Sequence, residues 1–172
     1  ECGNRGCWEQ YASGNALVRD ASELVRAGSP LSHRLDEMVG GDVTALTGPL
    51  VTEAAREGDP LAVQLIGEIG AWLGVGLAGM AAAFDPGCII VGGGVSEAGE
   101  LLLAPARAEF SRTLTGRGHR IEPPIVAAEL GPDAGFIGAA DMARSAARRS
   151  RRMRRRRRER PLRRRRSVLP DV

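Results

Sequence analysis

Lysine is absent from this sequence, and all 24 basic residues are arginine. The P-loop of many nucleotide-binding enzymes uses a lysine to bind phosphates, so the chain contains no motif of that kind. Aromatic residues are also scarce, at 3% of the chain. A core with so few large rings must be built from alanine, valine, leucine and isoleucine, with close backbone approach at some of the 23 glycines. The arginine bias itself is typical of a GC-rich coding sequence.

Long apolar runs and paired cysteines are missing too. The longest uncharged stretch, residues 69–84, is interrupted by four glycines and is shorter than the roughly 20 apolar residues of a membrane span. We therefore expect a buried core helix and no membrane partner. Three cysteines make an odd number, which favours a reducing compartment over a disulfide framework. These observations predict a cytoplasmic protein.

Charge divides the chain into two parts. From Arg148 onward there are 14 arginines against Glu159 and Asp171, a net charge of +12. The preceding residues hold 10 arginines and 19 acidic residues, a net charge of −9. At 172 residues and 43% hydrophobic composition, this acidic part is large enough for one folded domain. Overall basicity is therefore no evidence that the folded part binds nucleic acid.

Helical and strand patterns alternate along the acidic part. Asp59 and Pro60 are typical of a helix N-terminus, and a polar, glycine-interrupted connection is expected around residues 40–41. Strands separated by helices predict an α/β fold. The expected helices are residues 8–13, 15–27, 50–57, 59–84, 99–114 and 135–147, and the expected strands are residues 88–91 and 125–130.

A cysteine loop opens the chain, with Cys2 and Cys7 bracketing two glycines and Glu9 two residues further on. Thiolates held by a tight glycine turn can bind Zn²⁺, which takes four ligands in a closed structural site. The chain's other candidates are Cys88, His33 and His119, none of them near the loop in sequence. Because the chain begins with glutamate inside this motif, we expect a fragment whose further ligands lie upstream. The alternatives are two free thiols and a solvated carboxylate at Glu9.

A glycine loop follows the predicted strand 88–91. Three glycines at residues 92–94 precede Val95, and a helix is expected beyond them. This order places backbone N–H groups and a helix start at the carboxyl end of a strand, where open α/β sheets bind ligands. The loop lacks the GxGxxG fingerprint, and a glycine-rich turn of this kind taken alone is more often a plain connection than a nucleotide contact.

Taken together, the motifs are more specific than either one alone. The cysteine loop is followed by Tyr-Ala-Ser-Gly at residues 11–14, and later by Phe-Asp-Pro-Gly-Cys-Ile-Ile-Val-Gly-Gly-Gly-Val-Ser at residues 84–96 and Gly-Phe-Ile-Gly-Ala-Ala at residues 135–140. This series resembles the ROK family of bacterial sugar kinases and repressors, most closely its actinobacterial ATP-dependent glucokinases, over residues 1–147. The resemblance implies the C-terminal portion of an actin-like, ribonuclease H-like two-domain ATPase fold, with the N-terminal domain missing.

The resemblance also implies roles for particular residues. The family holds a structural zinc with one histidine and three cysteines, shapes its sugar pocket with that zinc, and binds ATP with Mg²⁺. By position, the matching residues are Cys2 and Cys7 for the metal, Glu9 for a sugar hydroxyl, and Gly92, Gly93, Gly94 and Val95 for the adenosine of ATP. Trp8 is expected to line the sugar pocket and Trp72 to pack in the core. The family's general-base aspartate has no counterpart in this chain, so we expect no catalytic residue here and no glucose phosphorylation by the chain alone.

Several alternatives stay open at this stage. The implied function is ATP-dependent phosphorylation of glucose to glucose 6-phosphate by a homo-oligomer, either a dimer or a tetramer. A sugar-responsive ROK repressor, or a kinase for another hexose such as N-acetylmannosamine, would keep the same motifs. Residues 148–172 are expected to form a disordered arginine-rich tail. Such a tail is either a nucleic-acid tether or the product of a frameshift or read-through.

Overall fold

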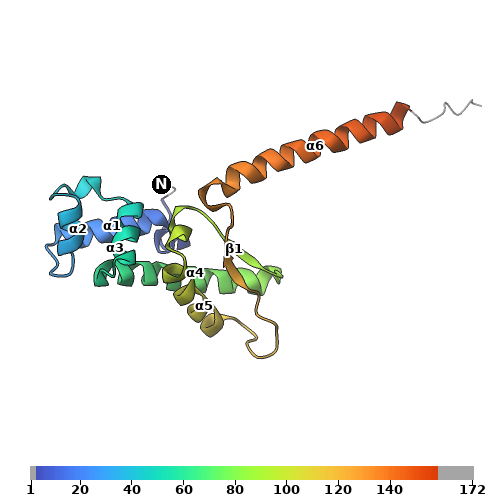
Figure 1. Ribbon diagram of the computed structural model, residues 1–172. Helices are drawn as coiled ribbons and strands as arrows, with labels where there is room; N and C mark the ends of the chain where they lie inside the picture. Colours follow the sequence, from blue (N-terminus) through green and yellow to red (C-terminus); the bar gives the residue numbers. More distant parts are fainter. Residues whose placement is uncertain (1–2, 159–172) are drawn as a thin grey trace, which may run out of the picture. The chain divides into compact units, whose positions relative to one another are not determined.

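The computed structural model describes residues 3–158, which form two compact units, one up to Ala134 and one from Gly135 onward. Figure 1 shows the order of the elements along the chain. The helices are α1 Gly14–Arg26, α2 His33–Met38, α3 Gly48–Arg56, α4 Pro60–Phe84, α5 Glu100–Thr113 and α6 Ala134–Arg158. The strands are β1 Ile89–Val91 and β2 Ile125–Ala127, and the 3-10 turns are η1 Trp8–Gln10, η2 Val43–Ala45, η3 Gly94–Ala98 and η4 Gly131–Asp133.

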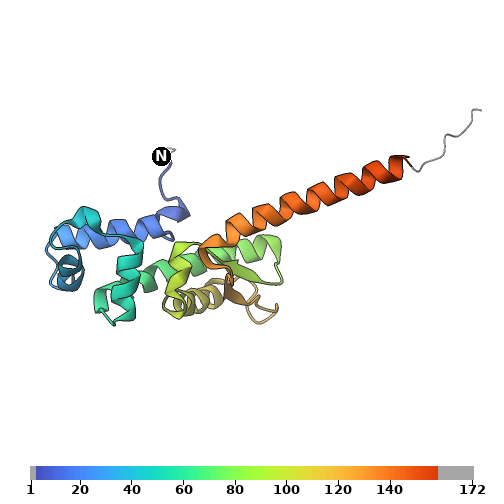
Figure 2. The same cartoon turned by 45° about the horizontal axis from the view of Figure 1, so that its top comes forward.

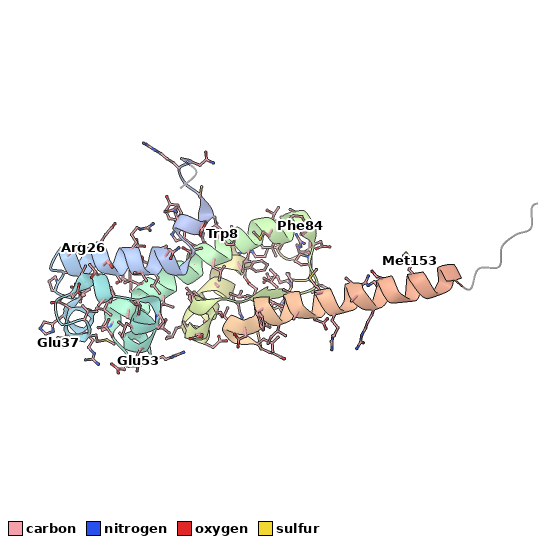
Figure 3. The ribbon with its side chains drawn as sticks, turned by 90° about the horizontal axis from the view of Figure 1, so that it is seen from above. Trp8, Arg26, Glu37, Glu53, Phe84 and Met153 are labelled. Atoms are coloured by element: carbon pink, nitrogen blue, oxygen red, sulfur yellow. The ribbon has the colours of Figure 1, made fainter. Side chains whose placement is uncertain are left out.

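Helix α4 is the central helix of the first unit. Its start is fixed by Asp59, whose Oδ1 accepts the N–H of Ala62 at 2.8 Å, with Pro60 at the first helical position. It ends at Asp85, which adopts a left-handed conformation with φ of 45°. By length and composition α4 could cross a membrane, yet half of its 18-residue apolar window is buried against other elements. Its last turn is solvated, with Phe84 80% exposed (Figure 3). The predicted core helix over residues 59–84 is confirmed.

Two glycines let α5 approach α4 closely. A Cβ atom added at Gly70 would lie 2.4 Å from the carbonyl oxygen of Leu102, and one at Gly74 would lie 2.3 Å from that of Ala106. Both neighbours are backbone atoms of α5, so no side-chain rotation could relieve the contact. The expectation that glycines substitute for large side chains in this core therefore holds where α4 and α5 pack.

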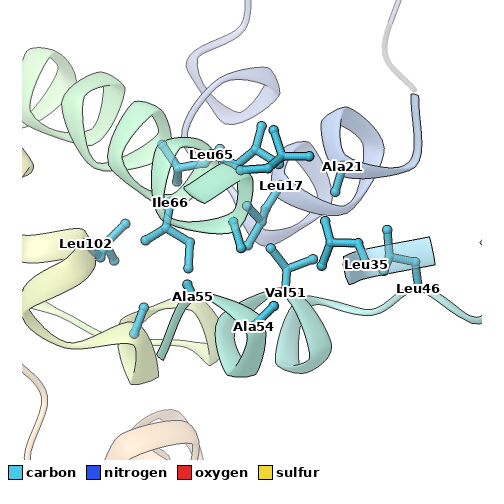
Figure 4. Packing of buried hydrophobic residues seen from close by; sticks show 14 of the residues in the cluster. Leu17, Ala21, Leu35, Leu46, Val51, Ala54, Ala55, Leu65, Ile66 and Leu102 are labelled. Atoms are coloured by element: carbon cyan, nitrogen blue, oxygen red, sulfur yellow. The ribbon is translucent and has the colours of Figure 1, made fainter. Parts of the chain in front are cut away.

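The core of the first unit has two parts along α4. Helices α1, α2 and α3 gather at one end of α4, while α5 and the strands lie further along it (Figures 1 and 2). The first cluster is aliphatic and includes Leu17, Leu35, Val51, Ile66 and Leu102, shown in Figure 4. The second cluster contains Leu77, Ala78, Ala81, Leu103, Phe110, Leu114 and Ile125.

The sheet consists of β1 paired in parallel with β2, with Ile89 opposite Ile125. A parallel pair needs a crossover connection, which α5 supplies. Ile125 is buried in the second cluster, whereas Ile90 is 68% exposed. The α/β class predicted from the sequence is confirmed, although β2 is shorter than the predicted strand 125–130.

Three sequence predictions of local structure are wrong. The predicted helix over residues 8–13 is only the 3-10 turn η1, and α1 begins at Gly14. Helix α2, within the stretch expected to lead into a polar connection, forms around the buried side chain of Leu35. Helix α6 does not end near Ala147 but continues to Arg158, so the first part of the predicted disordered tail is helical. Arginine is among the better helix formers, which favours this continuation. Residues 159–172 of the predicted tail lie outside the described residues.

Candidate functional site

The backbone of the cysteine loop reverses direction at its glycines. Gly3 and Gly6 both have positive φ, 81° and 72°, a conformation that other residues rarely adopt. The turn η1 follows directly, closed by a hydrogen bond of 2.9 Å from the backbone N–H of Gln10 to the carbonyl oxygen of Cys7. Cys7 is a free, half-buried thiol. The other predicted metal ligand, Cys2, lies outside the described residues.

A hollow of about 880 Å³ opens beside this loop, and we call it the loop hollow. Cys7, the predicted metal ligand, and Glu9, the predicted sugar-binding residue, both line it. Its wall includes amide and guanidinium groups as well as the carboxylate of Glu9. The lining residues are Asn4, Arg5, Gly6, Cys7, Glu9, Gln10, Tyr11, Ser13, Asn15, Ala16 and Arg19.

Sequence reasoning missed several polar residues of the loop hollow, among them Asn4, Asn15 and Arg19. Arg19 also holds the loop in place, since its guanidinium donates to the backbone carbonyl of Gln10 at 2.9 Å and to that residue's side-chain oxygen at 3.2 Å. Asn15 and Arg19 are four residues apart on α1 and therefore share a helix face. That spacing, next to the Tyr-Ala-Ser-Gly segment, was the available signal.

A second hollow of about 270 Å³, the glycine hollow, contains all four residues predicted for nucleotide contact. It lies where the start of α1 meets the end of β1, and its deeper wall comes from α4 and α5. Ser13 lines both hollows. The lining residues are Ala12, Ser13, Gly14, Ile69, Leu73, Val91, Gly92, Gly93, Gly94, Val95, Ser96 and Leu102.

Contacts across the glycine hollow bring together two motifs that are far apart in sequence. The cysteine motif is the cysteine loop together with the segment up to residue 14, and the glycine motif is residues 92–95. A Cβ atom at Gly14 would lie 3.0 Å from Cγ2 of Val95, so the first residue of α1 packs directly against the glycine loop. Ser13 caps α1, and its Oγ accepts the N–H of Ala16 at 3.2 Å. The fold therefore places the cysteine motif and the glycine motif next to each other.

The glycine loop has a conformation that requires glycine at one position. Gly93 has φ of 95° and ψ of 172°, a region essentially confined to glycine. Its carbonyl oxygen accepts the Oγ–H of the buried Ser96 at 2.6 Å and the backbone N–H of the same residue at 3.0 Å. The 3-10 turn η3 thus follows the loop, and α5 begins only after it. Sequence reasoning placed the helix correctly but did not foresee this turn.

The aromatic side chains of the cysteine motif lie on α4. The Nε1–H of Trp8 donates to the carbonyl oxygen of Trp72 at 2.7 Å, and Figure 3 labels Trp8 beside this helix. Tyr11 stacks on Trp72 with ring centroids 4.9 Å apart. Trp8, which the sequence predicted to line the sugar pocket, is absent from the lining of the loop hollow. Trp72 is 46% exposed and packs with Tyr11 at the surface of the unit.

The remaining candidate metal ligands do not join Cys7. Within residues 3–158, no three His, Cys, Asp or Glu side chains come together as a metal site would require. Cys88, His33 and His119 are exposed. His33 lies 3.4 Å from Glu37 in the neighbouring turn of α2. Cys7 is thus the one described thiol at the loop hollow, and a tetrahedral site would need three donors besides it.

Comparison with known proteins identifies the family. The sequence profile of the ROK family matches residues 1–146. The chain belongs to the ROK family. It is 45% identical to the glucokinase of Streptomyces coelicolor over 143 residues, which are 83% of this chain and 45% of that protein. The ROK glucokinase of Streptomyces griseus, whose crystal structure contains glucose and AMPPNP, matches with a TM-score of 0.77 and 49% identity over 84% of this chain and 46% of that one.

Regulators are also among the ROK relatives. The DNA-binding transcriptional dual regulator NagC of Escherichia coli is 33% identical over 129 residues, 75% of this chain and 30% of that protein. The chain spans about half the length of the curated glucokinases it matches. Its fold and family are therefore established over one portion of such a protein.

Proposed function

We propose that this chain is part of an ATP-dependent glucokinase that converts glucose to glucose 6-phosphate in the cytoplasm. One observation supports this most: the cysteine motif and the glycine motif line two adjoining hollows that share Ser13. A kinase must hold its sugar and its nucleotide next to each other, because phosphoryl transfer depends on positioning. The glucose and AMPPNP complex of the 49% identical Streptomyces griseus enzyme supports the same assignment of ligands.

In this proposal the loop hollow binds the sugar. Glu9 accepts a hydrogen bond from a sugar hydroxyl, and the amides of Asn4 and Asn15 can donate to and accept from further hydroxyls. The glycine hollow binds the adenosine of ATP against Gly92, Gly93, Gly94 and Val95, where missing side chains allow close approach to the backbone. ATP would enter with Mg²⁺. No residue of this chain is assigned as the general base.

Zinc is part of the proposal as a structural ion. Cys2 and Cys7 would supply two thiolates at the edge of the loop hollow, and the left-handed glycines between them let the chain turn back on itself. The ion would hold the loop that carries Glu9, as structural zinc stabilises small loops elsewhere. This chain provides at most half of a tetrahedral set, so the remaining ligands would come from elsewhere in the full-length protein.

The decisive experiment compares two charge-removing substitutions in the full-length protein. Glu9→Gln should raise the KM for glucose about tenfold or more, because a hydrogen bond to a charged acceptor is lost. Glu23→Gln is the matched control, since Glu23 is exposed on α1 and lines neither hollow. Equal glucose kinetics in the two variants would contradict the proposed sugar site. A coupled assay for glucose 6-phosphate provides the measurement.

Two other functions are tested with the same protein. The similarity to NagC supports a sugar-responsive repressor as the second candidate, which an electrophoretic mobility shift with promoter DNA would detect. A kinase for another hexose is the third candidate, so N-acetylmannosamine is included among the sugars assayed. We further propose a homo-oligomer, either a dimer or a tetramer, which light scattering after size exclusion would determine.

A further inference from the structure

Trp8 stands in sequence between the two loop residues that line the loop hollow, Cys7 and Glu9. Its own side chain leaves that hollow and lies on α4. We propose that Trp8 is a positioning residue, held in a seat on α4 formed by Gly76 and the carbonyl of Trp72, and that this seat sets Glu9 for sugar binding. The effect of Trp8 on sugar binding rests on the proposed function, whereas the position of its side chain on α4 does not.

The seat exists only because residue 76 is glycine. A Cβ atom at Gly76 would lie 2.0 Å from Cε2, 2.3 Å from Cζ2 and 2.5 Å from Nε1 of Trp8. Carbon atoms in ordinary contact are about 3.5–4.0 Å apart, so the indole plane rests on the bare backbone of α4. Every other side chain at residue 76 would push the indole off the helix. Gly76 has no positive φ, so its own backbone does not explain the glycine.

A hydrogen bond fixes the indole in that seat. Nε1–H of Trp8 donates at 2.7 Å to the carbonyl oxygen of Trp72, four residues before Gly76 on the helix. Tyr11 packs against Trp72 in a tilted arrangement, with an angle of 39° between the rings. The chain's two tryptophans and its single tyrosine therefore form one cluster. In a chain with so few aromatics, this concentration beside the loop hollow indicates a defined task.

The seat acts on Glu9 through the backbone. The carbonyl oxygen of Trp8 accepts the N–H of Tyr11 at 2.9 Å and of Ala12 at 3.0 Å, so moving the indole shifts the whole turn η1. Glu9 is the residue after Trp8 in that turn and makes no hydrogen bond of its own to α4 among the described residues. Its position relative to the sugar is therefore set by the seating of its neighbour.

The glycines of α4 provide a matched pair for the test. Gly76→Ala fills the seat, whereas Gly79→Ala adds the same methyl group to the same helix where nothing lies within 4 Å. In the full-length enzyme we expect Gly76→Ala to raise the KM for glucose about tenfold, with the KM for ATP changed less than about twofold. Gly79→Ala should leave both unchanged. A rise of both KM values together would show general damage and overturn the proposal.

A double-mutant cycle tests whether the effect of Gly76→Ala on glucose binding depends on Trp8. Trp8→Leu removes the three ring atoms that a Cβ at Gly76 would meet, and it should itself raise the KM for glucose. In that background Gly76→Ala should add less than about a twofold further rise, since contacting residues are not additive. If the two substitutions add fully, Gly76 acts independently of Trp8 and the proposal is wrong.

A readout without catalysis keeps this inference distinct from the proposed function. Cys7 is half-buried and Cys88 is exposed, so alkylation of these two cysteines, located by peptide mass spectrometry after a chelator has removed any bound zinc, compares the loop with an internal reference. Gly76→Ala should speed modification of Cys7 relative to Cys88 at least about threefold over Gly79→Ala, because the loop is released. An unchanged ratio overturns the seat. If the ratio changes while the wild-type protein phosphorylates no sugar, the seat holds and the proposed kinase function fails.

Discussion

Replacing Gly74 by alanine tests whether backbone contact between α4 and α5 holds this unit together. The new Cβ would lie 2.3 Å from the carbonyl oxygen of Ala106 and 2.9 Å from the backbone nitrogen of Phe110. Both atoms belong to the backbone of α5, and Phe110 is buried in the second cluster. Relief therefore requires one helix to move away from the other.

The size of the effect follows from two opposing contributions. Overpacking a core costs about 1–3 kcal/mol, and contact with rigid backbone puts this case at the upper end. Alanine improves helix propensity over glycine by about 1 kcal/mol. The free energy of unfolding should therefore fall by about 2 kcal/mol, which corresponds to a decrease in Tm of about 4–8 °C for a chain of this size.

Thermal unfolding followed by far-ultraviolet circular dichroism measures this decrease. Gly79→Ala in the same helix is the control, because its Cβ meets nothing within 4 Å and should leave the Tm unchanged or raise it. If Gly74→Ala is as stable as Gly79→Ala, the close approach of α4 and α5 is not a source of stability.

Three further results are expected. Gly93→Ala should lower the free energy of unfolding by about 1–3 kcal/mol relative to Gly94→Ala, because of the two glycines only Gly93 has a glycine-specific backbone conformation. In the full-length enzyme, Gly93→Ala should also raise the KM for ATP more than the KM for glucose. Equal effects of the two variants would contradict this. The hydroxyl of Thr44, and then its backbone N–H, hold the pKa of Asp42 below its ordinary value. This interaction therefore stabilises the fold above the unfolded pKa of about 4, and the stabilisation is lost as pH falls through the lower folded pKa. The difference in the free energy of unfolding between wild type and Thr44→Val, measured with urea, should shrink over that pH window. The 172-residue chain should bind single-stranded RNA with an affinity that falls steeply with salt, and a chain ending at Ala147 should lose this binding in the same filter assay, because 14 of the 24 arginines lie beyond it.

Local sequence signals were sufficient wherever the deciding interaction is local. Asp59 and Pro60 fixed the start of α4 because an N-cap and a first-turn proline act within one helical turn. The run 89–91 was identifiable as a strand because β-branched residues bounded by glycines favour that conformation. Helix α2 was missed because its six residues are held by burial of Leu35 against other elements, which no local pattern reveals. The end of α6 was missed because charge repulsion was given more weight than helix propensity.

Residue type and spacing marked Cys7 as a candidate metal ligand, and the resemblance to the ROK family implied the roles of Glu9 and of the glycines at 92–94. All of these residues line the two hollows, although other lining residues such as Asn15 and Arg19 were not predicted. That Ser13 joins the hollows, and that Trp8 turns away from the pocket onto Gly76, follows from packing between distant segments. Residue type does not separate the two positions of Trp8, because a tryptophan suits a pocket wall and a helix seat equally well. The choice between them depends on a bare patch of backbone 68 residues further along the chain, which exists only once α4 is folded against the loop.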